Sequence, residues 1–173
     1  MLTRPRYIKS PSVRMLERLE LEAYRRKHPT IPESAVVPTK HRDDTANGLT
    51  RCIIRYLQFK GHQAERINTM GRPIDTRRTY NVAGCIRQVG SLRWGKSTST
   101  TGSADISAVV FGRAVKVEVK IGADRQREAQ RCYQSAVERA GGLYFIAKDF
   151  NTFVEWLDDA FKDEMTYGES RNY

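Results

Sequence analysis

The sequence contains no long hydrophobic run. None of its apolar stretches approaches the ~18 consecutive residues that a membrane-crossing helix requires, and the opening segment, MLTRPRYIKS, lacks the apolar core of a secretory signal peptide. Hydrophobic residues make up 39% of the 173 residues and charged residues 29%, which fits one modest core beneath a heavily solvated surface. We therefore expect a soluble, cytoplasmic protein with no membrane partner.

Cysteines are also few. Cys52, Cys85 and Cys132 are odd in number, far apart in the chain and not in the CxxC spacing of zinc ligands. This usage argues against both a disulfide framework and a zinc site. Cys52 and Cys132 fall on the apolar faces of expected helices, where the favoured interpretation is a small buried hydrophobic side chain.

Acidic residues are outnumbered by basic ones. The chain has 30 Lys and Arg against 20 Asp and Glu, a net charge of +10, so we expect an acidic partner, with nucleic acid ahead of an anionic membrane surface. The excess is greatest over residues 66–96, where six arginines and one lysine stand against one aspartate.

Aromatic and hydroxyl side chains accompany this basic stretch. Tyr80 and Trp94 lie among the arginines, and the uncharged segment 97–103, STSTTGS, follows them. Guanidinium groups, hydroxyls and exposed aromatic rings suit phosphate contact and base stacking, so we expect nucleic-acid contact here rather than a merely solvated face. The pattern leaves residues 82–89 undecided between strand and short helix. The predicted contact residues are Arg72, Arg77, Arg78, Arg87, Arg93, Lys96, Ser97 and Thr98.

Residues 1–40 are expected to form a basic N-terminal helical arm and linker. Ser10 and Pro11 favour a helix that continues to about Lys27, and three prolines between positions 29 and 38 then interrupt the chain. Two alternatives remain open. The arm either binds nucleic acid or docks on a protein partner, or its helix folds back onto the domain.

The rest of the chain alternates between helix and strand signals. Apolar residues at i, i+3 and i+4 spacing predict a helix over residues 45–60 whose inward face is Leu49, Cys52, Ile53, Tyr56 and Leu57. The later elements are expected at 63–68 (strand), 106–111 and 114–121 (a hairpin turning at Gly112-Arg113), 124–140 (helix capped by Asp124), 143–147 (strand) and 153–162 (helix capped by Asn151). The core-facing stripe of the 124–140 helix is expected to be Ala129, Cys132, Tyr133, Ala136, Val137 and Ala140. This order indicates an α/β domain over residues 41–165, followed by a tail over 166–173.

The most informative stretch lies between positions 102 and 130. Alternation along the second hairpin strand places Glu118 and Lys120 together on the face opposite its valines, and Asp105 opens the partner strand. Mg²⁺ needs only about two carboxylates besides water and substrate phosphate. We therefore predict a divalent-metal site with Asp105, Glu118 and the carbonyl of Val119 as ligands.

Side chains around these ligands can complete a site. Lys120 can stabilise charge on a pentavalent phosphate, or orient the attacking water and help to deprotonate it. Gln126 and Gln130 are four residues apart, so they share one side of the expected helix. Gln130 can hydrogen-bond the water or the scissile strand, while Gln126 and Asn47 are accessory candidates. Glu-x-Lys alone equally describes an amphipathic strand with an ion pair on a wet sheet face, and the flanking features favour catalysis.

These residues also carry a family resemblance. Gly102-Ser103-Ala104-Asp105, then Val117-Glu118-Val119-Lys120, then Gln130 resembles the PD-(D/E)XK nuclease superfamily over about residues 46–147. Within it, the chain is similar to the VRR-NUC group of small phage and bacterial nucleases and, more distantly, to the archaeal Holliday-junction resolvases. The resemblance implies a restriction-endonuclease-like α/β core, with a central mixed β-sheet flanked by helices. It also implies cleavage of DNA, including branched or structured DNA, with Mg²⁺ or Mn²⁺.

The resemblance assigns roles by position. Asp105 and Glu118 correspond to metal ligands, Lys120 to the catalytic lysine and Gln130 to the helix glutamine. Ala104 replaces the proline that precedes the acid. Asn47 stands where related proteins often place a glutamate, so one-metal chemistry is favoured.

Three functions follow as expectations. The first is a metal-dependent endonuclease in a bacterial cell or a phage-infected host, as a homodimer if its cuts are paired. The alternative is a DNA-binding module without catalysis on the same fold. The third is an interaction protein that grips its partner through residues 1–40.

Overall fold

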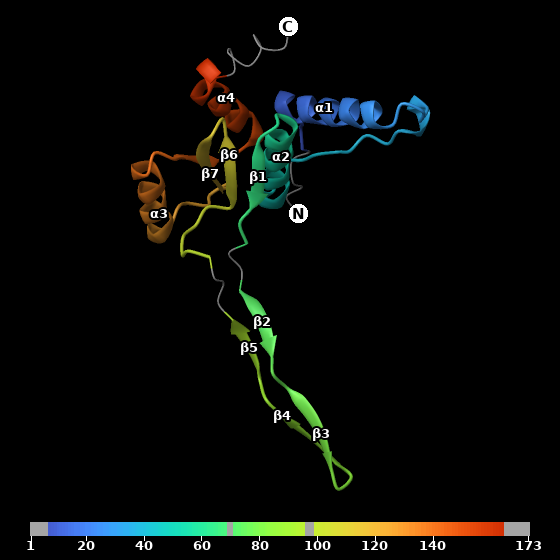
Figure 1. The fold of residues 1–173 in the computed structure, drawn as a ribbon, viewed down its shortest axis with the longest axis vertical. Coiled ribbons are helices and arrows are strands. Elements are labelled where there is room, and N and C mark those ends of the chain that lie inside the picture. The colour runs from blue at the N-terminus through green and yellow to red at the C-terminus, as the bar shows by residue number, and fades with distance from the viewer. Residues whose placement is uncertain (1–6, 69–70, 96–98, 165–173) are drawn as a thin grey trace, which may run out of the picture.

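The computed structural model describes residues 7–68, 71–95 and 99–164 (Figure 1). At its centre is a four-stranded mixed sheet in the order β1-β6-β7-β8, in which β1, β6 and β7 are antiparallel neighbours and β8 runs parallel to β7. The strands of this sheet are β1 (Gln63–Arg66), β6 (Ile106–Val110), β7 (Arg113–Val119) and β8 (Leu143–Ala147). The helices are α1 (Pro11–Lys27), α2 (Ala46–Phe59), α3 (Glu128–Arg139) and α4 (Phe150–Ala160), with a 3₁₀ turn at Glu33–Ala35.

The hydrophobic core lies between one face of this sheet and helices α1, α2 and α4. The predicted inward stripe of α2 is confirmed, because all five of its residues are at most 1% exposed. Thr45 caps the helix, its side-chain oxygen accepting a hydrogen bond from Gly48 N at 3.2 Å. Gly61, with a φ of +84°, follows the helix end. The expected mixed sheet flanked by helices is therefore present.

Helix α1 has the predicted bounds and packs on the domain. Val13 and Leu16 are fully buried in the same core as α2 and α4. Ser12 Oγ donates a hydrogen bond to Asn151 Oδ1 of α4 at 2.8 Å. Of the two alternatives for this segment, the structure therefore has the helix folded back against the domain.

The hairpin turns one residue earlier than predicted. Val110 pairs with Arg113, so the loop is Phe111-Gly112 and not Gly112-Arg113. Both loop residues have positive φ, +46° and +80°, as a two-residue hairpin turn of type I′ requires. The ring of Phe111 lies 5.7 Å from that of Phe161, a contact that helps to hold a non-glycine residue in this conformation.

Helix α3 differs most from its prediction. It begins at Glu128 with Arg127 as the N-cap residue, and not after Asp124, whose carboxylate is bonded to Lys120 instead. No residue of α3 is buried, and Cys132 is exposed, so the expected core-facing stripe and the buried Cys132 are wrong. The alanines of that stripe offer little apolar area to drive docking on the sheet.

The last helix also starts earlier than predicted. Asp149 caps α4, and its Oδ1 accepts a hydrogen bond from Thr152 N at 2.8 Å, so Asn151 is not the cap. Phe153 and Leu157 of this helix are fully buried. No helix within the described ranges is long and apolar enough to cross a membrane.

Between β1 and β6 the chain leaves the body as a long two-stranded arm (Figure 1). Its lower half is β3 (Arg78–Val82) paired with β4 (Cys85–Val89), and its upper half is β2 (Arg72–Asp75) paired with β5 (Leu92–Gly95), all antiparallel. The undecided segment 82–89 is thus a hairpin tip. Every residue of β3 and β4 is exposed, so the arm has no core of its own.

Candidate active site

The four residues predicted to be catalytic line one pocket on the face of the sheet that α3 covers. Asp105, Glu118, Lys120 and Gln130 surround a cavity of about 480 Å³. Other parts of its wall come from the start of α2, the loop before β6 and the segment between β7 and α3. The structure therefore brings together side chains that are up to 25 positions apart, from 105 to 130.

The hairpin register explains how Asp105 reaches this pocket. The β6–β7 ladder ends where Ile106 pairs with Val117, and Asp105 lies just before it. Its Oδ2 accepts a hydrogen bond from Val119 N at 2.9 Å. The carboxylate thus occupies the place of a ladder acceptor and is held beside the strand that carries Glu118.

The backbone of β7 orients the predicted carbonyl ligand. Lys120 N donates to Ala147 O at 2.9 Å, so the main-chain groups of Lys120 point toward β8. Main-chain polar groups alternate in direction along a strand. Those of Val119 therefore point the other way, toward Asp105, and the carbonyl of Val119 lies on the side where the predicted ligand set needs it.

Glu118 is an acid in an unfavourable environment. It is 3% exposed, and its Oε1 accepts hydrogen bonds from Lys120 Nζ and from Gln130 Nε2. Its Oε2 is buried and has no partner among the described residues. Burial raises the pKa of the Glu118 carboxyl, and the charge of Asp105 raises it further, against the lowering effect of the Lys120 hydrogen bond.

Lys120 lies between two acids. Its Nζ is 3.1 Å from Glu118 Oε1 and 3.2 Å from Asp124 Oδ2. Burial lowers the pKa of this ammonium, but the hydrogen bonds and charges of Glu118 and Asp124 outweigh burial, and the pKa is raised overall. Lys120 is therefore a protonated cation at neutral pH.

The two glutamines have different places. The side chain of Gln130 is fixed at both ends, because its Oε1 accepts from Arg127 N at 2.9 Å while its Nε2 donates to Glu118. Gln126 precedes α3 and donates to Gln134 Oε1 at 2.9 Å. It is absent from the described pocket wall, so the predicted shared helix side for the pair is wrong.

The predicted accessory residue Asn47 lies outside the pocket. Its neighbour Ala46 is the α2 residue in the pocket wall, while Asn47 is exposed and lines a separate groove along α2. In the described structure, α2 therefore brings no carboxylate to the site. This outcome agrees with a ligand set of two acids.

The predicted nucleic-acid residues that the structure describes lie on the arm and not in the pocket. Arg72, Arg77, Arg78, Arg87 and Arg93 are all exposed along its strands and linkers. Lys96, Ser97 and Thr98 lie outside the described residues. The register places Tyr80 directly opposite Arg87, so an aromatic ring and a guanidinium share one face of the arm.

Sequence reasoning gave Asp124 a different role, and it placed Gly102 in the family motif without a structural reason. Asp124 was interpreted as a helix cap, yet it is the second acid on Lys120. Gly102 has a φ of +81°, and a Cβ there would lie 2.3 Å from the carbonyl oxygen of Ala129 at the start of α3. The signal for Gly102 was its place three residues before the acid, where a close backbone approach calls for glycine.

The donor set fits a hard divalent cation. No group of three or more His, Cys, Asp and Glu side chains that could hold a metal occurs within the described ranges. The candidate set is instead two carboxylates and a carbonyl, and Glu118 Oε2 is a buried oxygen without a hydrogen-bond partner among the described residues. Oxygen ligands of this kind, completed by water and phosphate, suit Mg²⁺.

Comparison with models of known protein families gave no match. A search of curated proteins found no match either.

Proposed function

We propose that this chain is a divalent-metal-dependent nuclease, on a restriction-endonuclease-like fold, that hydrolyses DNA phosphodiester bonds in the pocket of Asp105 and Glu118. Glu118 carries the proposal. A buried carboxylate with one unpartnered oxygen, next to a second acid, is unfavourable for folding. Such arrangements are typical of functional sites, and a bound cation would relieve this one.

Each residue of the pocket has a role in this reaction. Asp105, Glu118 and the carbonyl of Val119 would hold Mg²⁺ or Mn²⁺. The cation, when bound, would polarise the phosphoryl oxygen and lower the pKa of a water molecule. Lys120 stabilises the negative charge that develops on the phosphate. Its raised pKa favours this electrostatic role over that of a general base.

Gln130 positions the acid. Its side chain bridges Arg127 N and Glu118 Oε1, so Oε2 is the oxygen of Glu118 that would remain available to a cation. A rigid carboxylate loses less entropy when it binds a cation.

The arm supports DNA as the substrate. Ile67, one residue beyond β1, donates its N–H to Asp105 O at 2.8 Å, so the base of the arm borders the pocket. The arm presents exposed arginines and the half-exposed ring of Tyr80 (47%). These groups suit phosphate contact and base stacking, and we propose that the arm holds the DNA that the pocket cleaves.

A second candidate function is a DNA-binding module without catalysis. It is favoured by one observation, namely that α2 places only Ala46 in the described pocket wall. In the described structure α2 therefore adds no carboxylate to Asp105 and Glu118 as metal ligands.

A substrate panel separates the two candidates. Supercoiled, linear, single-stranded and four-way-junction DNA are each incubated with the protein and Mg²⁺, Mn²⁺ or EDTA. The nuclease cuts at least one substrate only with metal, and Lys120→Ala abolishes the cutting. Salt-dependent binding without cutting in any metal would favour the binding module.

A further inference from the structure

A second cavity of about 480 Å³ lies between α2 and the edge strand β1. We call it the α2 groove. Arg51, Arg55 and Arg66 line it together with Asn47 and Gln58, and no acidic residue belongs to its described wall. The groove is therefore a concave surface of positive charge.

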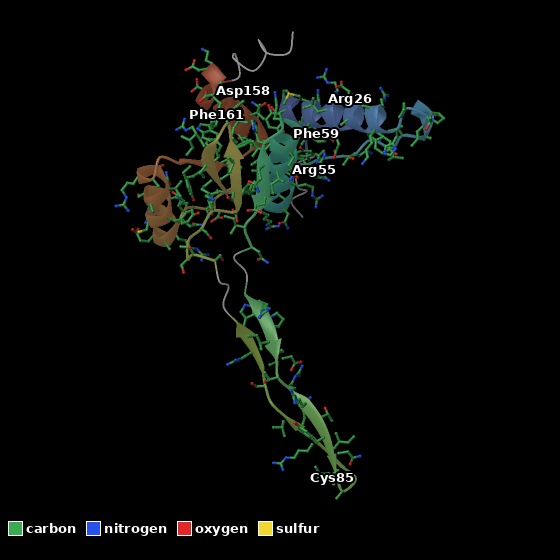
Figure 2. All side chains as sticks on the ribbon, viewed as in Figure 1. Arg26, Arg55, Phe59, Cys85, Asp158 and Phe161 are labelled. Atoms are coloured by element: carbon green, nitrogen blue, oxygen red, sulfur yellow. The ribbon has the colours of Figure 1, made fainter. Side chains whose placement is uncertain are left out.

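The arginines of the α2 groove are available to a ligand. Arg51 and Arg55 are four residues apart on α2 and share one side of it, and Arg66 belongs to β1. All three are exposed, and none makes an ion pair within the described part of the chain. Figure 2 shows Arg55 on α2 at the body of the molecule, well away from Cys85 at the arm tip.

The scaffold of the α2 groove is rigid. The opposite side of α2 is buried in the core, with Ile53 and Leu57 fully covered. Gln58 Nε2 donates a hydrogen bond to Ala64 O at 3.1 Å and so ties the helix to β1. The guanidinium groups therefore project from two elements whose relative position is fixed.

Residues adjacent in sequence line the candidate active site and the α2 groove. Ala46 lines the pocket, and Asn47, the next residue, lines the groove. On the strand side, Arg66 lines the groove, and the following residue, Ile67, bonds to the main chain of Asp105 at 2.8 Å. A strand that enters the pocket can thus continue into the groove.

The dimensions suit a nucleic-acid strand. From Asn47 to Gln58 the helix is about 16 Å long at a rise of ~1.5 Å per residue. Each strand of duplex DNA carries one phosphate per ~3.4 Å of helix axis, and neighbouring phosphates lie farther apart than this along the winding backbone, so more than one but only a few phosphates fit along the groove. Guanidinium groups bind phosphate oxygens in a bidentate manner.

We propose that the α2 groove binds the sugar–phosphate backbone of a nucleic-acid strand, flanking the phosphate that lies in the pocket. That the phosphate in the pocket is the one to be cleaved rests on the proposed function. Binding of the backbone in the groove needs neither metal nor cleavage. The contacts are to phosphates, so they are independent of base sequence.

The test measures binding of the full chain to a fluorescein-labelled DNA duplex by anisotropy, in EDTA, over a series of salt concentrations. The plot of log K against log [salt] has a negative slope, and each lost phosphate contact reduces the magnitude of this slope by about 0.9. We expect Arg51→Ala/Arg55→Ala to reduce this magnitude by about 2 and Arg66→Gln by about 1, for duplexes of any sequence. Alanine is a strong helix former, and Arg66→Gln on β1 is an independent second variant.

The matched control is Arg14→Ala/Arg18→Ala. These arginines are also exposed and four apart, but on α1, and neither lines either cavity. Both double variants remove the same charge, so only a specific groove makes them differ. Equal slopes for the two double variants would refute the proposal that the α2 groove binds the nucleic-acid backbone. A wild-type chain without affinity for the duplex would refute it as well.

Failure of the groove and failure of the nuclease are distinguishable. If Arg51→Ala/Arg55→Ala weakens the salt dependence of DNA binding but the wild-type chain never cuts DNA, the proposal for the groove stands and the proposed nuclease activity is refuted. If the wild-type chain cuts DNA with metal, and the double variant binds and cuts DNA as the wild type does, the proposed nuclease activity stands and the proposal for the groove is refuted.

Discussion

The buried pair of Glu118 and Lys120 should respond unequally to the loss of each partner. Lys120→Met removes the ammonium and leaves the Glu118 charge buried beside Asp105. Removing one partner of a buried ion pair costs about 3–5 kcal/mol, and with Lys120 only 6% exposed and Glu118 3% exposed we expect a loss of stability in that range.

Glu118→Gln should have a much smaller effect. The new side chain keeps an oxygen that accepts from Lys120, and Lys120 keeps its contact with Asp124 at 3.2 Å. The substitution also removes a charge that burial disfavours. We expect a change within about 1 kcal/mol, the usual size of one net hydrogen bond.

Urea unfolding in EDTA at neutral pH measures both changes. The double variant Glu118→Gln/Lys120→Met should be less destabilised than Lys120→Met alone, because a neutral pair replaces a lone buried charge. Glu118→Gln could instead lower the free energy of unfolding as much as Lys120→Met does, or the effects of the two substitutions could be additive. Either result would show that burial does not disfavour the charge on Glu118 and would refute this prediction.

The pH dependence has a definite sign. The folded-state pKa of Glu118 lies above its unfolded value. Its contribution to stability is therefore present below the unfolded pKa and is lost as the pH rises through the folded pKa. The wild-type chain should gain stability relative to Glu118→Gln on acidification through this window.

Three further predictions concern the loop, the metal and the arm. Gly112→Ala should lower the stability by about 1–2 kcal/mol through its left-handed backbone alone. Gly102→Ala should lower it more, because a Cβ at Gly102 meets a carbonyl oxygen at 2.3 Å, whereas one at Gly112 meets nothing within 4 Å. Equal losses of stability in thermal unfolding would contradict this. Mg²⁺ affinity, measured by calorimetry, should fall as the pH drops through the raised Glu118 pKa, since proton and cation compete for one carboxylate; a pH-independent affinity would exclude Glu118 as a ligand. Tyr80→Ala with Arg87→Ala should weaken single-stranded DNA binding by about fivefold or more, given ~1–3 kcal/mol for one stacked base. The melting temperature should stay unchanged, because both residues are exposed. Unchanged DNA binding would show that the arm does not contact the DNA.

Local patterns predicted the elements whose residues meet the core. The stripe on α2 repeats at helical spacing and is buried as expected. The valines of β7 alternate, and Val115 and Val117 are buried while Glu118 faces the other side. Each of these patterns depends on one element and one burial direction, which is information that the sequence holds locally.

Elements governed by tertiary contacts were predicted less well. Asp124 is a good N-cap by residue type, but its carboxylate is bonded to Lys120, and α3 starts at Glu128. The small residues of α3 have helical spacing but remain exposed, because periodicity does not reveal how closely a helix approaches the sheet. Asn47 lies one position away from the pocket-lining Ala46, a difference that only the helix rotation decides.

The arm could be placed by charge but not by shape. Every residue of β3 and β4 is exposed, so these strands have no buried face to impose a readable alternation. The hairpin is defined by its cross-strand register, for example Tyr80 opposite Arg87, and by the Ala83-Gly84 turn with φ of +51° and +82°.

The most direct test of the central claim is the rate of Mg²⁺-dependent DNA cleavage by Asp105→Asn, measured beside Asp159→Asn. Asp105 lines the pocket, whereas Asp159 is an exposed acid of α4 that lines neither described cavity. We expect the cleavage rate of Asp105→Asn to fall by about 10²–10³-fold or more, the size of a lost electrostatic contribution to catalysis, and that of Asp159→Asn to equal the wild-type rate. Cleavage by Asp105→Asn at the wild-type rate would contradict this expectation.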